Sequence, residues 1–404
     1  MANAFLSWRQ CVTLCLFAIW PQAFVAQEAF ESSRAENTLT TAAQEQQEAQ
    51  REIDEAATLA EAESKEKNKS KRGSFVVAPI PISNPALGSG LVPVIGYIFP
   101  LSKKDKVSPP SVVGGAALFT DNGSRAAAFA GQLYFAHNTY KTTAVYARGN
   151  LNYDLYGSGA SEGLKLPIKQ TGQVFQAEFL RRIAWQFFLG PRFMRGNSII
   201  TDRSTGTKEV PPPPPDLGLD TALTALGVRL ARDTSENRFY PMSGTYFSFT
   251  SDFFSEALGS KYSFQSYRAN FSKYWNWGEK HVLAYNGYSC STGGAPPFYG
   301  NCIYGSSNQL RGYVPGKYFD RYTLATQLEY RLALPFRLGV VGFGGIGEAI
   351  PGDDPLLFMH NDFLPAGGVG VRLLLSRQYH VNLRSDFAWG KDGHTFNLGI
   401  GEAF

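Results

Sequence analysis

Residues that could carry out chemistry are few in this sequence and lie far apart. A serine hydrolase would need a histidine beside a serine to accept the hydroxyl proton, and the chain has five histidines: His137, His281, His360, His380 and His394. They lie at or near the ends of expected strands, and none has a compelling serine and acid constellation nearby. No cluster has metal-ligand spacing, and no glycine-rich phosphate loop precedes a helix. The sequence therefore predicts no catalytic residue, no metal and no cofactor.

One arginine is notable for its position. The stretch "NQLRGYVPGKYF" places Arg311, followed by Gly312, between two segments that alternate apolar and polar residues. A connection needs no cation, and glycine permits a tight backbone. This loop is therefore predicted to carry Arg311 to a partner elsewhere in the protein.

Composition excludes several classes of protein. The chain has 404 residues, of which 44% are hydrophobic and 18% charged, with 41 Gly, 30 Phe and 20 Tyr. This composition argues against a disordered chain and against a protein of long helices. The formal net charge of +4 is small and dispersed, whereas nucleic-acid binders carry a basic stripe or patch. Nucleic acid is therefore not an expected partner.

The first 26 residues are predicted to be a secretory signal peptide. Arg9 precedes an apolar run over residues 11–20, and small residues follow at Ala23 and Ala26. A run of about ten apolar residues is too short for a bilayer core, which needs about 20. The mature protein is therefore expected outside the cytoplasm.

Export bears on Cys290 and Cys302, which lie close together in "SCSTGGAPPFYGNC". In an exported chain such a pair favours a disulfide over a metal site. Two free thiols remain the alternative.

Residues 27–72 differ sharply in composition from the rest. The stretch "TTAAQEQQEAQREIDEAATLAEAESKEKNKSKR" is rich in helix-forming Ala, Glu, Gln and Lys and lacks Pro and Gly. It is predicted to be a short, low-complexity helical segment in the periplasm. Its apolar residues recur loosely near a heptad spacing at Ala42, Ala49, Ile53, Ala56 and Ala60. A solvated tether is favoured, and a coiled coil is the alternative.

Residues 73–404 alternate apolar and polar residues with a period of two, which indicates strands. In "RYTLATQLEYRLALP", Leu328, Tyr330 and Leu332 oppose Gln327, Glu329 and Arg331. In "YHVNLRSDFAW", Leu383 and Phe387 oppose Arg384 and Asp386. In "VYARGNLNYDLY", Val145, Leu151, Tyr153 and Leu155 oppose Arg148, Asn150, Asn152 and Asp154.

The polarity of the second face decides the fold class. The inner face of a soluble sandwich would supply aliphatic packing, whereas these strands carry Arg, Asp, Glu and Asn on one face. That pattern is typical of an outer-membrane barrel with lipid outside and water inside. We therefore expect an all-β, transmembrane antiparallel β-barrel of about 16 strands over residues 73–404, surrounded by outer-membrane lipid. An even strand number puts both chain ends in the periplasm and the loop of Arg311 outside.

Three stretches together resemble the Omp85 superfamily, or bacterial surface antigen (D15), barrel. "LRGY", which is Leu310, Arg311, Gly312 and Tyr313, resembles the tip of the family's sixth outer loop, which folds back into the lumen. "RLARDTSENRFYPMSGTYFSF" is similar to the family's D-x-R/N...F-P-x-x-G turn, with Asp233, Asn237, Pro241 and Gly244 at matching places. "QLEYRLALP" resembles the strand that follows the loop.

The resemblance implies roles for several residues. Arg311 would pair inside the lumen with Glu329, and Asp386, which alternation also points inward, would be a second partner. Phe404 resembles the aromatic end of the signal that barrel-assembly machinery reads, although Glu402 breaks the alternation before it. Barrel-assembly machinery is thereby an expected partner during biogenesis.

The chain departs from the family at two places. Family assembly factors carry periplasmic POTRA domains of about 75 residues, and residues 27–72 are too few to hold one. A separate periplasmic partner protein is therefore an open alternative. The family's F-x-D-x-G strand is "FGGIG" here, so Gly345 stands where a lumen aspartate is expected.

The first strand, "SFVVAPIPIS", is predicted to form a weak seam. Pro79 and Pro81 lack an N–H, and residues two apart point that group toward the same edge of a strand. If that edge faces the last strand, the barrel could open there, as the resemblance implies.

Three functions remain open at this stage. The leading one is a barrel that assists insertion or translocation of proteins or lipids at the outer membrane. A passive or structural barrel or pore is the alternative, and an outer-membrane hydrolase is less favoured because of the scattered histidines. The sequence does not name a substrate.

The cysteine pair gives the first testable prediction. Mass spectrometry of protein from native outer membranes should find the peptides of Cys290 and Cys302 joined. A bridge closing about a dozen residues would stabilise the protein by about 3 kcal/mol in the chain-entropy model, so reduction should lower the unfolding temperature. Finding both thiols free would contradict the prediction.

Overall fold

The computed structural model describes residues 73–404 except residues 103, 106, 157–164, 204–219, 238–239, 279, 298–299, 306–308, 351–362 and 377–380. The predicted signal peptide and helical segment, residues 1–72, lie outside the described residues. His360 and His380 do so as well. None of the helical turns in the described part of the chain is long and apolar enough to cross a membrane.

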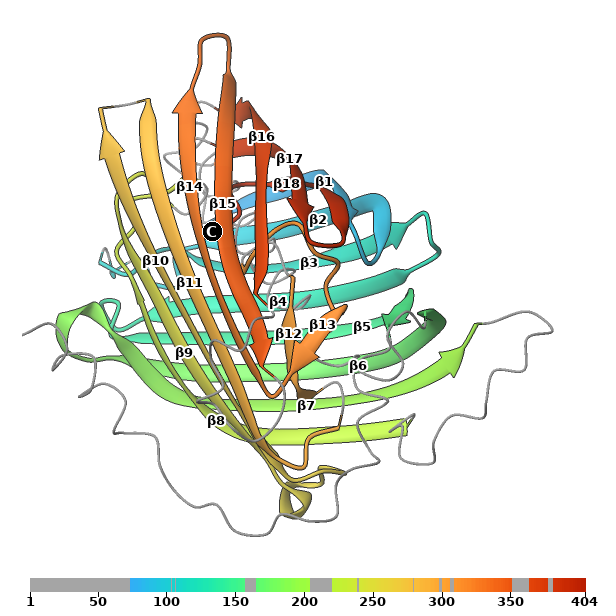
Figure 1. The fold of residues 1–404 in the computed structure, drawn as a ribbon. Coiled ribbons are helices and arrows are strands. Elements are labelled where there is room, and N and C mark those ends of the chain that lie inside the picture. The colour runs from blue at the N-terminus through green and yellow to red at the C-terminus, as the bar shows by residue number, and fades with distance from the viewer. Residues whose placement is uncertain are drawn as a thin grey trace, which may run out of the picture. The chain divides into compact units, whose positions relative to one another are not determined.

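Sixteen of the described strands close into an antiparallel barrel, which confirms the predicted fold class (Figure 1). The first eight are β1 (Ser74–Asn84), β2 (Gly88–Phe99), β3 (Ser111–Thr120), β4 (Arg125–Phe135), β5 (Tyr140–Tyr156), β6 (Lys165–Arg182), β7 (Phe188–Asp202) and β8 (Asp220–Asp233). The others are β9 (Gly244–Phe254), β10 (Phe264–Trp277), β11 (His281–Gly294), β14 (Tyr322–Ala333), β15 (Leu338–Ile350), β16 (Leu364–Ser376), β17 (Val381–Gly390) and β18 (Gly393–Ile400). Two short 3₁₀ turns, Ala184–Gln186 and Glu256–Leu258, lie in connections.

Each wall strand pairs with its neighbour in the chain, except where a small hairpin intervenes. β11 pairs directly with β14, because β12 (Cys302–Tyr304) and β13 (Tyr318–Asp320) form a separate two-stranded sheet within the connection between them. The other exception is the closing contact. β1 pairs with β2 along its whole length, but with β18 at a single position, Ser83 opposite Leu398.

The two rims of the barrel differ in their connections. Strands meet through short turns at one rim, such as 136–139, 183–187 and 334–337, which we call the short-turn rim. The connections 157–164, 203–219 and 295–321 belong to the opposite, long-loop rim. This asymmetry is the one seen in outer-membrane barrels, whose periplasmic turns are short and whose outer loops are long.

Large apolar side chains are exposed on the outer surface of the barrel wall. Phe129 is 68% exposed, and Val369 and Val371 are more than half exposed. Apart from the β1–β18 contact, neighbouring strands pair with one another around the closed sheet. An apolar outer surface on a closed barrel is what a lipid environment requires.

One predicted face is reversed in β5. Val145 and Tyr153 are buried on the inner face, whereas Arg148 and Asn150 are exposed on the outer face, so the prediction of an apolar outer face for this stretch is wrong. Tyr153 belongs to an apolar cluster inside the barrel toward the long-loop rim, with Leu87, Ile168, Met194, Ile200, Leu223, Ala225, Phe254 and Phe264. Alternation separates the two faces of a strand but does not say which is inside.

Adjacent isoleucines in β7 test this apolar interior. Ile200 is buried in the cluster, while Ile199 is 51% exposed on the outer face. Ile200→Asp would bury an unpaired carboxylate and should lower the free energy of unfolding by about 3 kcal/mol or more. Thermal unfolding of the purified barrel in detergent measures this effect, and Ile199→Asp is the matched control. Equal unfolding temperatures for the two variants would contradict the interior assignment.

Candidate functional site in the lumen

The loop of Arg311 lies inside the barrel and is attached to its wall. The Cys290–Cys302 disulfide joins β11 of the wall to the β12 hairpin, with 5.6 Å between the Cα atoms. Tyr304, Leu310 and Tyr313 are buried in an apolar cluster with that disulfide. The loop is therefore fixed by a covalent bond at its base and by packing along its length.

The tip of the loop packs tightly against the last strands. Gly312 has a φ of +115°, and a Cβ atom there would lie 2.9 Å from the Cβ of Ala366 and 3.0 Å from the carbonyl oxygen of Trp389. Both the backbone angle and the space favour glycine. The Tyr313 hydroxyl donates to the carbonyl of Pro365 at 2.6 Å. These contacts place the loop tip against β16 and β17.

Arg311 is fully enclosed at this place. Its Nε donates to Gln327 Oε1 at 2.9 Å and its Nη1 to Asp386 Oδ2 at 2.7 Å, and its Nη2 donates to Glu329. The guanidinium also lies 3.5 Å from the centre of the Phe343 ring, in a cation–π contact. The structure thus brings Arg311 together with both carboxylates named from the sequence.

Each of these carboxylates also contacts a second arginine. Arg331 Nε donates to Glu329 Oε1 at 2.6 Å, and Arg372 Nη1 donates to Asp386 Oδ1 at 2.6 Å. Arg372 Nε then donates to Glu402 Oε2 at 2.7 Å. The same Glu402 oxygen lies 3.8 Å from Arg331 Nε.

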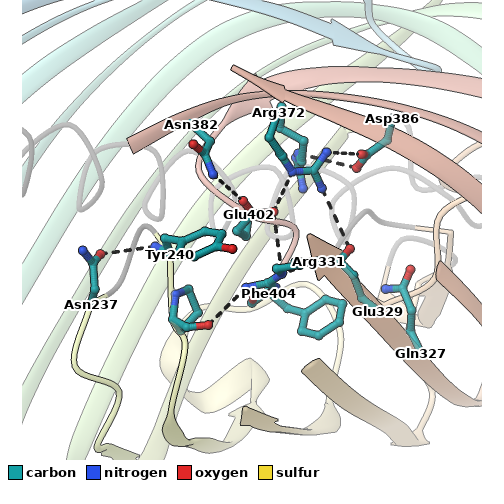
Figure 2. A network of polar contacts seen from close by, with 12 residues as sticks. Asn237, Tyr240, Gln327, Glu329, Arg331, Arg372, Asn382, Asp386, Glu402 and Phe404 are labelled. Atoms are coloured by element: carbon teal, nitrogen blue, oxygen red, sulfur yellow. Dashed lines mark hydrogen bonds and ion pairs between the residues drawn. The ribbon is translucent and has the colours of Figure 1, made fainter. Parts of the chain in front are cut away.

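These six side chains form a closed ring of alternating charge, drawn in part in Figure 2. Its order is Arg311, Glu329, Arg331, Glu402, Arg372, Asp386 and back to Arg311. We call it the charge ring. The side chains are at most 3% exposed, so the ring replaces water as their electrostatic environment.

The charge ring includes the segment that follows the last strand. β18 ends at Ile400, and residues 401–404 are buried, with Glu402 also accepting a hydrogen bond from Asn382 (Figure 2). Arg331 Nη2 donates to the Phe404 carbonyl oxygen at 2.9 Å. The inward turn explains why Glu402 breaks the strand alternation. A role of Phe404 as an assembly signal concerns the unfolded chain and stays a prediction.

The turn between β8 and β9 lies beside the charge ring. Arg331 Nη1 donates to the Pro241 carbonyl at 3.2 Å, and the Arg331 guanidinium lies 5.9 Å from the centre of the Tyr240 ring. Burial raises the pKa of Tyr240 to about 12, so its phenol is neutral at physiological pH. The family-like turn thus supplies a carbonyl and a neutral aromatic face to Arg331.

Leu310 fills the space that an aspartate would need at position 345. A Cβ atom on Gly345 would lie 2.6 Å from Leu310 Cδ1 and 2.2 Å from the Thr326 carbonyl oxygen. The glycine is therefore required by the loop, whose leucine packs onto the bare backbone of β15. The packing of Leu310 against β15 thus accounts for glycine in place of the family's aspartate at position 345.

Sequence reasoning found part of the charge ring and missed the rest. Arg311, Glu329 and Asp386 were named as a group, but three members were not joined to them: Arg331, Arg372 and Glu402. Arg372 had a signal, because it is the one charge in the apolar stretch "VGVRLLLS". The seam prolines, Pro79 and Pro81, lie in β1 and not in this lumen site.

The described histidines lie outside the charge ring. His281 Nδ1 is 2.6 Å from the Tyr330 hydroxyl, His394 stacks on Phe387, and His137 is in an exposed turn. Within the described residues, no group of His, Cys, Asp and Glu could hold a metal ion. The contacts of Arg311 with Gln327, Glu329 and Asp386 hold the loop by buried charge, and we call this arrangement the latch.

A comparison with protein-family models decides the family. Residues 131–404 match the Omp85 superfamily domain. The chain belongs to the Omp85 superfamily. Together, the family and the closed barrel point to the bacterial outer membrane.

Solved structures share the Omp85 fold at low sequence identity. CdiB from Acinetobacter baumannii is similar with a TM-score of 0.54 and 12% identity, over 82% of this chain and 60% of that one. BamA from Haemophilus ducreyi lacking POTRA domains 1–3 is similar with a TM-score of 0.52 and 15% identity, over 81% of this chain and 70% of that one. The aligned part thus spans less than two thirds of the CdiB chain. Among curated protein sequences, none matches this chain closely.

The latch predicts a selective effect of removing Arg311. In Arg311→Ala, Glu329 keeps Arg331 and Asp386 keeps Arg372, so the barrel should fold while the loop loses its anchor. Trypsin should then cut the loop at Lys317 about tenfold faster or more, because local opening exposes it.

The matched control is Arg337→Ala, which removes an exposed arginine from the β14–β15 turn. It should leave both the cleavage rate and the gel mobility of the folded barrel unchanged. An Arg311→Ala barrel that is folded and cleaved at the rate of the unaltered protein would refute the latch.

Proposed function

We propose that this Omp85 barrel assists the insertion or translocation of protein or lipid at the outer membrane by opening between β1 and β18. The observation that carries the proposal is the single paired position of that seam, Ser83 opposite Leu398. Neighbouring strand pairs have continuous ladders; β17 and β18, for example, pair from Leu383–Ile400 to Gly390–Gly393. A sheet opens where the fewest backbone hydrogen bonds must be broken.

The prolines of β1 support the same site of opening. Pro79 and Pro81 donate no backbone hydrogen bond to any strand. β1 keeps its full register with β2, in which Pro79 lies opposite Pro93. We infer that the donors missing from β1 weaken its β18 side.

The charge ring links the loop to this seam. Glu402 lies two residues after β18 ends and contacts Arg372, which contacts Asp386 and through it Arg311. A movement of β18 away from β1 would pull on Glu402 and disturb the partners of Arg311. In the proposed cycle, the loop and the seam therefore change together.

Capture of a substrate would need a further component in this proposal. A separate periplasmic protein would deliver the substrate. The alternative function, a passive or structural barrel, requires neither that partner nor seam opening. Depletion of the protein separates the two, because only an assembly barrel should lower the amounts of specific outer-membrane proteins or lipids.

A locked seam tests the proposal directly. Ser83→Cys with Leu398→Cys joins the paired positions of β1 and β18, whose separation in a ladder suits a disulfide. In cells depleted of the unaltered protein, we expect the oxidised variant to restore less than about a tenth of the lost outer-membrane components, because a covalent bridge blocks opening. Reduction of the bridge should restore the rest.

The control shares one of the two cysteines. Ser385→Cys with Leu398→Cys bridges the continuous β17–β18 pair, at partners of the same ladder register. It should restore those components fully whether oxidised or reduced. Full restoration by the oxidised Ser83–Leu398 bridge would show that the seam need not open.

A further inference from the structure

The outer face of β5, β6 and β7 changes from apolar to polar partway along the strands. Tyr146 and Phe175 are more than 40% exposed and pair across β5 and β6. Arg195 lies opposite Phe175, and farther toward the long-loop rim polar side chains and the exposed Ile199 share the same face. We call the polar residues the outer-face patch: Arg148, Asn150, Lys169, Gln173, Arg195 and Asn197. Arg148 and Asn150 are two of the four β5 residues that alternation alone had placed on the lumen face.

Strand length explains how charge can lie on this face. β5, β6 and β7 have 17, 18 and 15 residues, whereas a tilted strand needs about 9 to 11 to cross the hydrocarbon core. Their surplus extends past the core at the long-loop rim. A lipid-facing cation is costly at the bilayer midplane and nearly free near its surface. The patch therefore belongs at the level of the lipid headgroups.

The patch is cationic and rich in amides. Arg148 pairs with Gln173, which pairs with Asn197, and Arg195 lies two residues from Asn197 in β7. With strands about 4.8 Å apart, these two arginines are roughly 12 Å apart at the backbone, within reach of one headgroup. The carboxylates described on this face of β5–β8, Asp154 and Asp220, lie farther along the strands toward the rim.

An apolar groove begins at the edge of the patch. It has a volume of about 510 Å³ and runs over the outer face from β6 to β1, between Phe175, Tyr146 and Phe129 at one end and Tyr97 and Phe75 at the other. Glycines, including Gly115 and Gly131, form part of its floor. The Tyr146 hydroxyl at the groove's rim donates to Gln173 Oε1 at 2.9 Å, which joins the groove to the patch.

We propose that the patch and groove together bind a phosphorylated glycolipid of the outer leaflet. Arg148, Lys169 and Arg195 would hold its phosphate groups through charge-assisted hydrogen bonds. The amides of Asn150, Gln173 and Asn197 offer donors and acceptors to sugar hydroxyls, which a simple phospholipid headgroup lacks. An acyl chain occupies the groove. The assignment rests on the orientation proposed above, in which the long-loop rim faces outward.

Binding of purified lipopolysaccharide to the full barrel in detergent tests the proposal by native mass spectrometry. Arg148→Gln with Arg195→Gln should weaken binding about 30-fold, from the contribution of each basic residue at a lipid surface. Arg181→Gln with Arg337→Gln is the matched control, because these exposed arginines lie at the short-turn rim. The control should bind within about twofold of the unaltered barrel. Gel mobility of the folded barrel confirms folding of each variant.

Three results would overturn the assignment. Equal binding of lipopolysaccharide by the patch variant and the control would exclude the outer-face patch as the headgroup site. Displacement of the glycolipid by an equal amount of phosphatidylglycerol would show that the site binds anionic lipids in general and does not select a glycolipid. Unchanged binding by Gly131→Leu, whose added side chain enters the groove beside Val113, would remove the acyl-chain site. The assay needs no assembly activity, so its failure leaves the seam proposal untouched.

Discussion

The buried charge ring is the interaction on which the lumen of this barrel depends. A guanidinium or carboxylate removed from water loses several kcal/mol of hydration, and a single ion pair often fails to offset that loss. Here each of the six charges has an opposite charge on both sides, and the ring as a whole is neutral. Removal of any one member leaves each of its two neighbours with one opposite charge of the ring in place of two. The loop, β14, β16, β17 and the segment after β18 must therefore be placed together.

The wall of the barrel does not need the ring to stay closed. Apart from the β1–β18 contact, its strands pair with their neighbours, and such backbone pairing is what holds a barrel in lipid. The ring instead selects one position for the loop among those that the lumen could hold. The strand ladder therefore stabilises the barrel, whereas the buried charges position the loop. The weak ladder between β1 and β18 lies next to the segment that supplies Glu402 to the charge ring.

Strand alternation and one loop motif were enough to predict the barrel and half of the charge ring. Glu329 and Asp386 lie on strands whose charged residues all fall on one face. The expectation of a polar lumen therefore predicted that both side chains point inward. Glu402 could not, because its direction depends on the chain leaving the sheet after Ile400. Arg148 and Asn150 were assigned to the wrong side, since a period of two is the same seen from either face. The apolar cluster that decides the matter is built from strands distant in sequence.

The glycine at position 345 shows how the charge balance and the packing agree. A carboxylate there would add a fourth negative charge near a ring whose three arginines already have three acidic partners, and it would be buried. It would also collide with Leu310, which reaches the β15 backbone. Arg372 and Glu402 enter the ring as a pair and leave the net charge of its six members at zero, while Arg384 lies outside the ring, 3.8 Å from Asp386. At this place Leu310 packs against the bare backbone of Gly345, where the family motif would have a polar side chain. The loop is therefore held by ion pairs at Arg311 and by apolar packing at Leu310.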